Sequence, residues 1–208
     1  MTNGAETRRA RTRAAILEAA ERLFLRTGYS GTSMDEVAAE ADVSKQTVYA
    51  HFGSKETLFV EMVEGMTGGA GDALLARVED PSPDRPIEEF LHDFAVEQLR
   101  IVMTPRLLQL RRLVIGEVER FPELGATLHR RGPARSITRL ASAFRAYAAQ
   151  GVIAVPDPEA AGAYFNWLVM GGPTNDAMFL GDAAIPPESS FAPHARECVR
   201  IFIAAYGT

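Results

Sequence analysis

The sequence predicts an all-α protein, in which a small three-helix domain with a helix-turn-helix precedes a larger helical bundle. Apolar residues recur at helical period along almost the whole chain, and no segment shows the alternation of a strand. Two short helices are also predicted to start near Ser33 and Ser44, and the turn that joins them is only about four residues long. We therefore expect an N-terminal domain over residues 1–60 and a helical domain over residues 61–208.

The first two helices are predicted from an apolar stripe and a capping signal. From Thr7 to Thr27 the apolar residues repeat every three or four positions, and Gly28 follows as a stop. Ser33 and Glu36 then have the spacing of a capping box, in which each side chain bonds the other residue's backbone amide. We expect a short second helix that ends near Asp42.

The third and fourth helices follow from two further caps. Ser44 is the expected N-cap of the third helix, and Val43 and Val48 have the spacing of a hydrophobic staple that fixes how the chain enters it. Gly53 and Ser54 end this helix and open a fourth, which we expect from Lys55 to Val78.

The remainder of the chain reads as a loop followed by long amphipathic helices. Three prolines predict a loop over residues 77–86, and Pro105 suits a first helical position. A kink is expected at Gly132 and Pro133 within the third of the later helices. The expected helices are Ile87–Met103, Pro105–Arg120, Glu123–Gln150, Pro158–Leu180 and Phe191–Tyr206.

Composition narrows the function classes. The net charge is −5, yet residues 1–60 hold eight basic and eight acidic side chains, with four arginines between Arg8 and Arg13. This basic tip on an acidic chain points to a polyanionic partner. Cys198 is the only cysteine, so no intrachain disulfide is possible. No signal peptide and no membrane-length apolar run is present, which predicts a cytoplasmic protein with no membrane partner.

The third helix has the side chains of a DNA reader. Residues 44–52 contain no acid, which favours approach to phosphates. Lys45 and Gln46 stand at its start, where recognition helices present guanine- and adenine-bonding groups to the major groove. Polar groups suited to phosphate contact are Thr47, Tyr49, His51 and the helix starts at Thr32-Ser33 and Ser54-Lys55. The plainer alternative is a solvated helix face, but the caps, turn and basic tip occur together.

These motifs resemble the DNA-binding domain of the TetR family of transcriptional repressors. The matching segments are R-A-A-I-L-E-A-A-x-x-L-F-x-x-x-G-Y from Arg13, G-T-S-M-D-E-V-A from Gly31 and A-x-V-S-K-Q-T-V-Y-x-H-F-x-S-K-E-x-L from Ala41. The resemblance implies that Lys45, Gln46 and Tyr49 face the operator. It places Thr32, Ser33, Thr47, His51 and Lys55 near phosphates. Many members carry Gly where this chain has Gln46, so base contacts are expected to be particular to it.

The same resemblance implies a ligand-responsive repressor that binds a palindromic DNA operator as a homodimer through its last two helices. A small, mostly apolar effector is expected to release it by binding the C-terminal domain. The expected effector residues are Phe94, Met103, Leu107, Leu110, Glu117, Trp167 and Met170. Each also has a structural reading: the apolar ones suit a core equally well, and Glu117 suits a solvent border. The two last helices, likewise, could simply cover their own core.

A glycine run interrupts the predicted fourth helix at Gly65, Gly68, Gly69 and Gly71, each costing about 1 kcal/mol relative to Ala in a helix. One hypothesis is a hinge, a soft point or break in the helix where ligand-driven motion is absorbed, and the alternative is a plain loop with no signalling role.

Two other classes of function compete with a DNA-binding regulator. The chain carries no G-x-S-x-G, H-E-x-x-H, Walker or dinucleotide-binding motif, and its four histidines are scattered. We therefore predict no catalytic residues, no metal site and no cofactor. A helical interaction protein that does not bind DNA is the second alternative. Sequence-specific binding to the promoter beside the gene would separate these classes.

Overall fold

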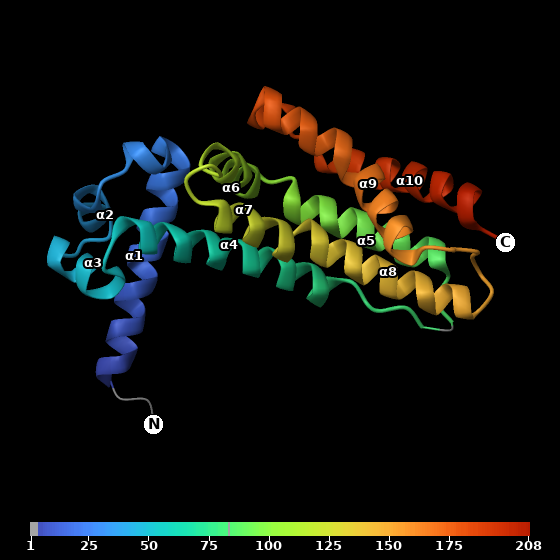
Figure 1. Cartoon of the computed structure of the whole chain (residues 1–208), viewed down its shortest axis with the longest axis horizontal. Coiled ribbons are helices and arrows are strands. Elements are labelled where there is room, and N and C mark those ends of the chain that lie inside the picture. The colour runs from blue at the N-terminus through green and yellow to red at the C-terminus, as the bar shows by residue number, and fades with distance from the viewer. Residues whose placement is uncertain (1–3, 83) are drawn as a thin grey trace. The chain divides into compact units, whose positions relative to one another are not determined.

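The computed structural model describes residues 4–82 and 84–208 and confirms the predicted all-α class (Figure 1). Over these residues the extended structure is limited to a single β-bridge between Ile153 and Gly207. Residues 1–3 of the predicted N-terminal domain and Pro83 of the predicted loop lie outside the described part.

Backbone contacts divide the chain into two compact units, and each unit is made of two separate segments of the sequence. The first unit combines Met1–Met66 with Gln109–Ala126, and the second combines Thr67–Leu108 with Thr127–Thr208. The chain therefore passes between units inside three helices: α4 (Lys55–Arg77), α6 (Pro105–Gly116) and α7 (Pro122–Arg131). The predicted boundary at residue 60 assigned the whole 109–126 segment to the second domain.

In the first unit, capped short helices surround an apolar core. The capping box of Ser33 and Glu36 opens α2 (Met34–Glu40), and the Ser44 hydroxyl accepts the Thr47 amide at the start of α3 (Lys45–Phe52). Between them Asp42 adopts a left-handed φ of 53°, which lets the amides of Asp42 and Val43 bond the last free carbonyls of α2. Local sequence thus fixes the turn that aims α3.

The first helix is longer than predicted. Helix α1 spans Gly4–Gly31, with Gly28 inside it at φ 74° and ψ 176°. Gly28 therefore does interrupt the helix, as expected, but a further helical turn follows it. A left-handed φ of this kind is inexpensive only for glycine.

The second unit packs α8 (Pro133–Ala149) against α9 (Pro158–Leu180), and α5 (Ile87–Val102) against α10 (Phe191–Tyr206). Two short 3₁₀ turns, Asp182–Ala184 and Glu188–Ser190, join α9 to α10. At its centre the Phe202 ring lies 4.6 Å from that of Phe144 and 5.4 Å from that of Phe165. This side of α10 thus belongs to the protomer's own core.

Two predicted helix boundaries were wrong. Helix α6 ends at Gly116 rather than at Arg120, and the single helix expected over 123–150 is two helices, α7 and α8. The break falls at Gly132, whose ψ of −106° is not helical, and Pro133 then starts α8 at a position where its missing N–H is harmless. The predicted kink is therefore a complete break.

Proline 173 sits inside α9 and leaves the Val169 carbonyl without its helical N–H partner. The His194 Nε2 atom of α10 lies 2.8 Å from this oxygen and must donate to it, because a carbonyl only accepts. The carbonyl of Leu168, the residue before Val169, lies 3.5 Å from the Cys198 thiol of α10. Burial raises the pKa of this thiol to about 11. Side chains of α10 thus form hydrogen bonds with backbone carbonyls of α9.

Helix α4 runs unbroken through the glycine run, so both the predicted break and the plain-loop alternative were wrong, and a soft point within the helix stays a prediction. Its end is capped by Arg139, which donates to the carbonyls of Leu74 and Val78. A Cβ atom at Gly71 would lie 2.9 Å from the Arg131 carbonyl oxygen, whereas one at Gly65 or Gly69 would meet no atom within 4 Å. Gly71 therefore allows a close backbone approach, while Gly65 and Gly69 have no such packing reason.

We expect Gly69→Ala and Gly71→Ala to change stability in opposite directions. Gly69→Ala adds a methyl group in open space and should stabilise the protein by about 1 kcal/mol through helix propensity. Gly71→Ala forces that methyl group against a backbone oxygen and should destabilise it by about 1–3 kcal/mol. Urea unfolding of both variants measures the pair, and equal effects would contradict the packing explanation.

Candidate nucleic-acid interface and effector site

Helix α3 exposes a polar face, and its opposite face is buried. Val48 and Phe52 are 0% and 4% exposed, whereas Lys45, Gln46 and Tyr49 are exposed, and Thr47 and His51 are half-buried. The residues predicted to face the operator are therefore those that the structure leaves on the surface. Their role in base contact stays a prediction.

The acid-free face of α3 has an acidic neighbour that its own sequence does not reveal. Asp35 of α2 places Oδ1 2.8 Å from the Lys45 ammonium nitrogen, and this carboxylate raises the pKa of Lys45. Both side chains are exposed, so the pair contributes little stability and can open easily. Lys45 can exchange Asp35 for DNA at low cost.

Two predicted phosphate contacts are used inside the domain. The Thr32 side chain is 3% exposed, and its hydroxyl donates to the Gly28 carbonyl. Its side chain therefore does not lie on the surface where a phosphate contact requires it, because it fixes the end of α1 instead. The Ser33 hydroxyl is exposed but lies 2.8 Å from the Glu36 carboxylate within the capping box.

Lys55, also predicted to contact phosphate, lies above an aromatic ring. Its ammonium nitrogen is 4.4 Å from the centre of the Tyr29 ring, and the Arg120 guanidinium lies 4.6 Å from the same centre. Burial, followed by the positive charge of Arg120, lowers the pKa of Lys55. The Tyr29 hydroxyl donates to Glu56 at 2.8 Å. Lys55 thus helps hold Tyr29, and a phosphate contact from it stays a prediction.

The 109–126 segment is bound into the first unit through the same tyrosine. The Phe121 ring lies 4.9 Å from the Tyr29 ring and 5.5 Å from the Phe59 ring, and Arg120 approaches Glu56 at 3.7 Å. Aromatic pairs at these separations add to the stabilisation from burial. Residues from the middle of the chain therefore complete the core of the first unit, which the family motif alone did not indicate.

We expect Tyr29 to make the first unit sensitive to alkali. Burial, followed by the hydrogen bond to Glu56, raises the pKa of Tyr29 from 10.0 to about 12. Below pH 10 the tyrosine is protonated in both the folded and the unfolded chain, whereas between pH 10 and 12 only the unfolded chain loses the proton. Folding stability should therefore fall by about 2–3 kcal/mol over that window.

Tyr29→Phe should remove this pH-dependent loss, at the cost of the hydrogen bond to Glu56. Unfolding midpoints in urea at pH 9 and pH 11 measure the difference, and Tyr49→Phe, at an exposed tyrosine, is the control. If Tyr29→Phe and the parent lose the same stability, Tyr29 does not titrate in this window.

Basic side chains continue the interface along α1. Arg8, Arg9 and Arg11 are exposed and form no ion pair within the described residues. Arg13 differs, since it pairs with Glu61 and its guanidinium carbon lies 5.1 Å from the centre of the Phe52 ring. Three of the four arginines of the basic tip are thus available to a polyanion.

The predicted effector residues do not share one unit. Phe94, Met103 and Met170 belong to the buried core of the second unit, where Leu107 is half-buried and Trp167 is 42% exposed. Leu110 and Glu117 lie in the first unit, where Glu117 bears on the ionisation of Tyr29 and Lys55. A role for these side chains in effector binding stays a prediction.

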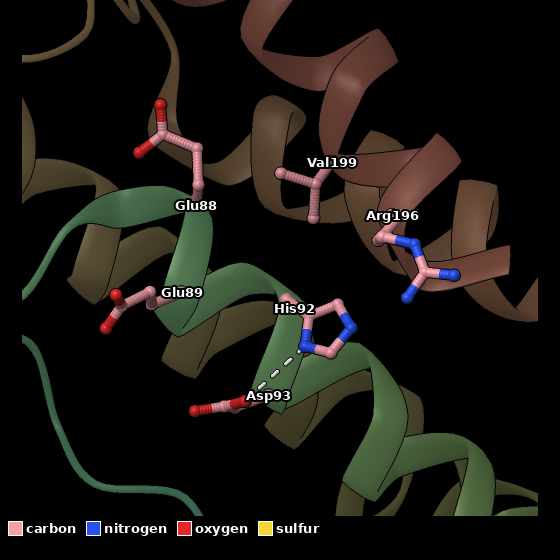
Figure 2. A pocket seen from close by; sticks show the side chains of 6 residues that line it. All are labelled: Glu88, Glu89, His92, Asp93, Arg196 and Val199. Carbon is pink, nitrogen blue, oxygen red and sulfur yellow. Dashed lines mark hydrogen bonds and ion pairs between the residues drawn. The ribbon is translucent and has the colours of Figure 1, made fainter. Parts of the chain in front are cut away.

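A shallow hollow of about 380 Å³ opens between α5 and α10 in the second unit (Figure 2). His92 Nδ1 lies 3.5 Å from Asp93 Oδ1, and Arg196 faces them from α10. The lining residues are Glu88, Glu89, His92, Asp93, Arg196 and Val199. None of the predicted effector residues is among them. Its mixed charges and openness suit solvent better than a mostly apolar ligand.

The second unit contains a buried pair of side-chain amides that the sequence analysis did not predict. Gln98 of α5 and Asn166 of α9 are 4% and 1% exposed, and Gln98 Nε2 donates to Asn166 Oδ1 at 2.8 Å. Within the described part of the chain, Gln98 Oε1, Asn166 Nδ2 and the Thr174 hydroxyl have no hydrogen-bond partner. Each unpaired buried group costs about 1–3 kcal/mol. The signal that could have found them is a polar residue on an apolar helical stripe.

No helix among the described residues is long and apolar enough to cross a membrane. No group of three or more histidine, cysteine, aspartate or glutamate side chains in the same residues is placed to hold a metal ion.

Family models match both parts of the chain. Residues 16–62 match the model of bacterial regulatory proteins of the tetR family, and residues 89–208 match the C-terminal domain of AefR-like transcriptional repressors. With its helix-turn-helix and all-helical architecture, the molecule is a DNA-binding transcriptional regulator. The chain belongs to the TetR family, whose members are regulators and not enzymes.

Solved structures agree over nearly the full length. A TetR-family regulator from Mesorhizobium loti MAFF303099 is 35% identical, covers 97% of this chain and 99% of its own, and has a TM-score of 0.87. The flavonoid-responsive regulator FrrA is 30% identical, covers 95% of this chain and 98% of its own, and has a TM-score of 0.75. The repressor NicS of Pseudomonas putida is 30% identical over 48% of this chain and 50% of its own. The chain spans only about half the length, or less, of the first curated relatives it matches.

Proposed function

We propose that this protein is a transcriptional repressor that binds a palindromic operator as a homodimer and releases it when a small, mostly apolar effector binds its second unit. The observation that carries the proposal is the exposed, acid-free face of α3 at the end of a capped turn, with Lys45, Gln46 and Tyr49 on its surface. Such a regulator acts on chromosomal DNA and therefore in the cytoplasm.

An apolar face on α9 supports the homodimer. Tyr164, Trp167 and Phe179 are 64%, 42% and 80% exposed, and helical spacing places them on one side of α9. Large exposed apolar groups on one helix face are typical of interaction surfaces. A second copy of the chain is the proposed occupant, because two-fold symmetry matches two α3 helices to two half-sites of a palindrome.

The 109–126 segment supports a route from effector to DNA. It packs on Tyr29 and Phe59 behind the reading helices, while α6 itself begins in the second unit. An effector that favours one position of α6 would therefore also favour one arrangement of the first unit. The operator affinity then falls by the difference in effector affinity between the two states.

Repression is proposed over activation because the C-terminal match is to AefR-like repressors, whereas FasR of Mycolicibacterium smegmatis, an activator, is 34% identical over only 39% of this chain. FrrA responds to flavonoids, so planar hydroxylated aromatics are reasonable first compounds to test as effectors.

The test is a gel shift with the promoter region beside the gene, in rising salt, with and without a flavonoid panel. We expect a specific complex with two protein chains per operator, whose affinity falls steeply with salt. A complex that forms equally on unrelated DNA, or no complex at all, would refute a sequence-specific regulator. A specific complex that recruits polymerase and raises transcription would refute repression alone.

A further inference from the structure

We infer that Gln98 and Asn166 form the polar anchor of the effector site, and that they recognise an uncharged hydroxyl on an otherwise apolar ligand. The inference rests on the proposed effector function and specifies the chemistry of that site. The two amides come from different helices, α5 and α9, and meet at 2.8 Å inside the core of the second unit.

The unpaired atoms persist however the amides are oriented. As placed, the pair uses one N–H of Gln98 and the Asn166 oxygen, which leaves the Gln98 oxygen and the Asn166 amide nitrogen without partners among the residues that the structure describes. Exchanging oxygen and nitrogen in both side chains reverses the donor but again leaves one acceptor and one amide nitrogen unpaired. In either orientation the pair therefore offers one unused hydrogen-bond donor and one unused acceptor.

A hydroxyl group is the smallest group that satisfies both atoms, because it donates one hydrogen bond and accepts others. A carboxylate would accept from the amide nitrogen but face the amide oxygen with a like partial charge. Among the described residues of the second unit, the fully buried polar side chains are neutral: Thr67, Gln98, Thr127, Ser136, Asn166 and Thr174. The largely buried Arg139 side chain is already engaged with the Leu74 and Val78 carbonyls and with Asp80. An ionised ligand would therefore be buried without a counter-charge.

The surroundings suit an apolar ligand body. Phe94 lies one helical turn before Gln98, and Met170 lies one turn after Asn166, with Thr174 and its unpaired hydroxyl a further turn along α9. Phe94 and Met170 belong to the same buried cluster as Met103. Methionine side chains change shape at low cost, so Met103 and Met170 can move aside for a ligand while the amides keep their places.

The pair is tested with three matched probes: naphthalene, 2-naphthol and 2-naphthoate. We expect 2-naphthol to bind the purified protein at least about tenfold more tightly than naphthalene. Naphthoate should bind most weakly. In ¹⁵N-resolved spectra the side-chain amide signals of Gln98 and Asn166 should shift with naphthol and stay in place with naphthalene.

The double variant Gln98→Leu/Asn166→Leu removes both partners at once, which avoids leaving one buried amide alone and should preserve folding. It should bind naphthol and naphthalene within about twofold of each other. Gln150→Leu, at an exposed glutamine, is the control and should keep the preference for naphthol. A thermal melt of each variant checks that it is folded.

Several outcomes would overturn the anchor. For the parent protein, these outcomes are equal binding of naphthol and naphthalene, or no binding of naphthol. For the double variant, the outcome is a preference for the hydroxyl that survives the substitutions. A crystal structure in which ordered water bonds both amides and stays when naphthol is bound would also contradict it. Operator binding by the double variant separates the two proposals. If it binds the operator and responds to an effector as the parent does, only the anchor fails.

Discussion

Gln46→Glu should weaken operator binding by about 100-fold or more. The side chain is exposed at the start of α3, on a face whose own residues include no acid, so a carboxylate there would meet DNA phosphates and base acceptors. Like charges held together at an interface cost several kcal/mol. The helix itself should not suffer, because a negative charge near a helix N-terminus is favourable. Fluorescence anisotropy with labelled operator at fixed salt measures the loss.

Gln46→Ala is the matched control for the Glu variant. It removes the amide without adding charge, so it should relax the preference at one base pair, worth about 1–3 kcal/mol, and keep affinity for unrelated DNA. Near-parental operator binding by Gln46→Glu would show that this face of α3 does not approach DNA. Equal losses in both variants would show that the amide, and not the absence of acid, matters.

Tyr164→Arg/Phe179→Arg should convert the protein from dimer to monomer and weaken palindrome binding by about 100-fold or more. The two side chains are 64% and 80% exposed, so their replacement leaves the protomer's own core intact. Charges on an apolar face shared by two copies would be buried against their symmetry mates, and the gain from two linked half-sites would be lost. Sedimentation velocity and a gel shift measure the two effects.

Ser142→Arg, at an exposed position of α8, is the control for the added charge and should leave both mass and affinity unchanged. On α10, by contrast, Val199 and Phe202 are 7% and 3% exposed and belong to the core of their own chain, so the proposed interface relies on α9. A double variant that stays dimeric would move the interface away from this face of α9.

Short-range signals in the sequence were sufficient for most of the helix starts. Capping residues such as Ser33 and Ser44 act within one turn, so their pattern predicted the starts of α2 and α3. The ends of α9 and α10 were also predicted to the residue, since Gly181 and Gly207 follow them directly. The error at Gly132 arose because its helix-breaking ψ depends on the following proline and on packing.

Contacts between distant segments were not predictable. Nothing near Thr32 in sequence shows that its side chain is buried, and nothing near Lys45 shows that Asp35 lies beside it. Tyr29 was matched only as part of a motif, although Lys55 and Arg120 both approach its ring. The predicted effector residues were chosen helix by helix, so the sequence did not show that Phe94 and Glu117 belong to different units.

The bond from His194 to the Val169 carbonyl makes the residues at positions 173 and 194 depend on each other. Pro173 frees that carbonyl, and His194 occupies it, so each residue is tolerable because of the other. Replacing Pro173 by a residue with a backbone N–H would restore the helical bond and release His194 from its role. Across relatives we expect exchanges at 173 and 194 to occur together, and a proline at 173 to be accompanied by a hydrogen-bond donor at 194.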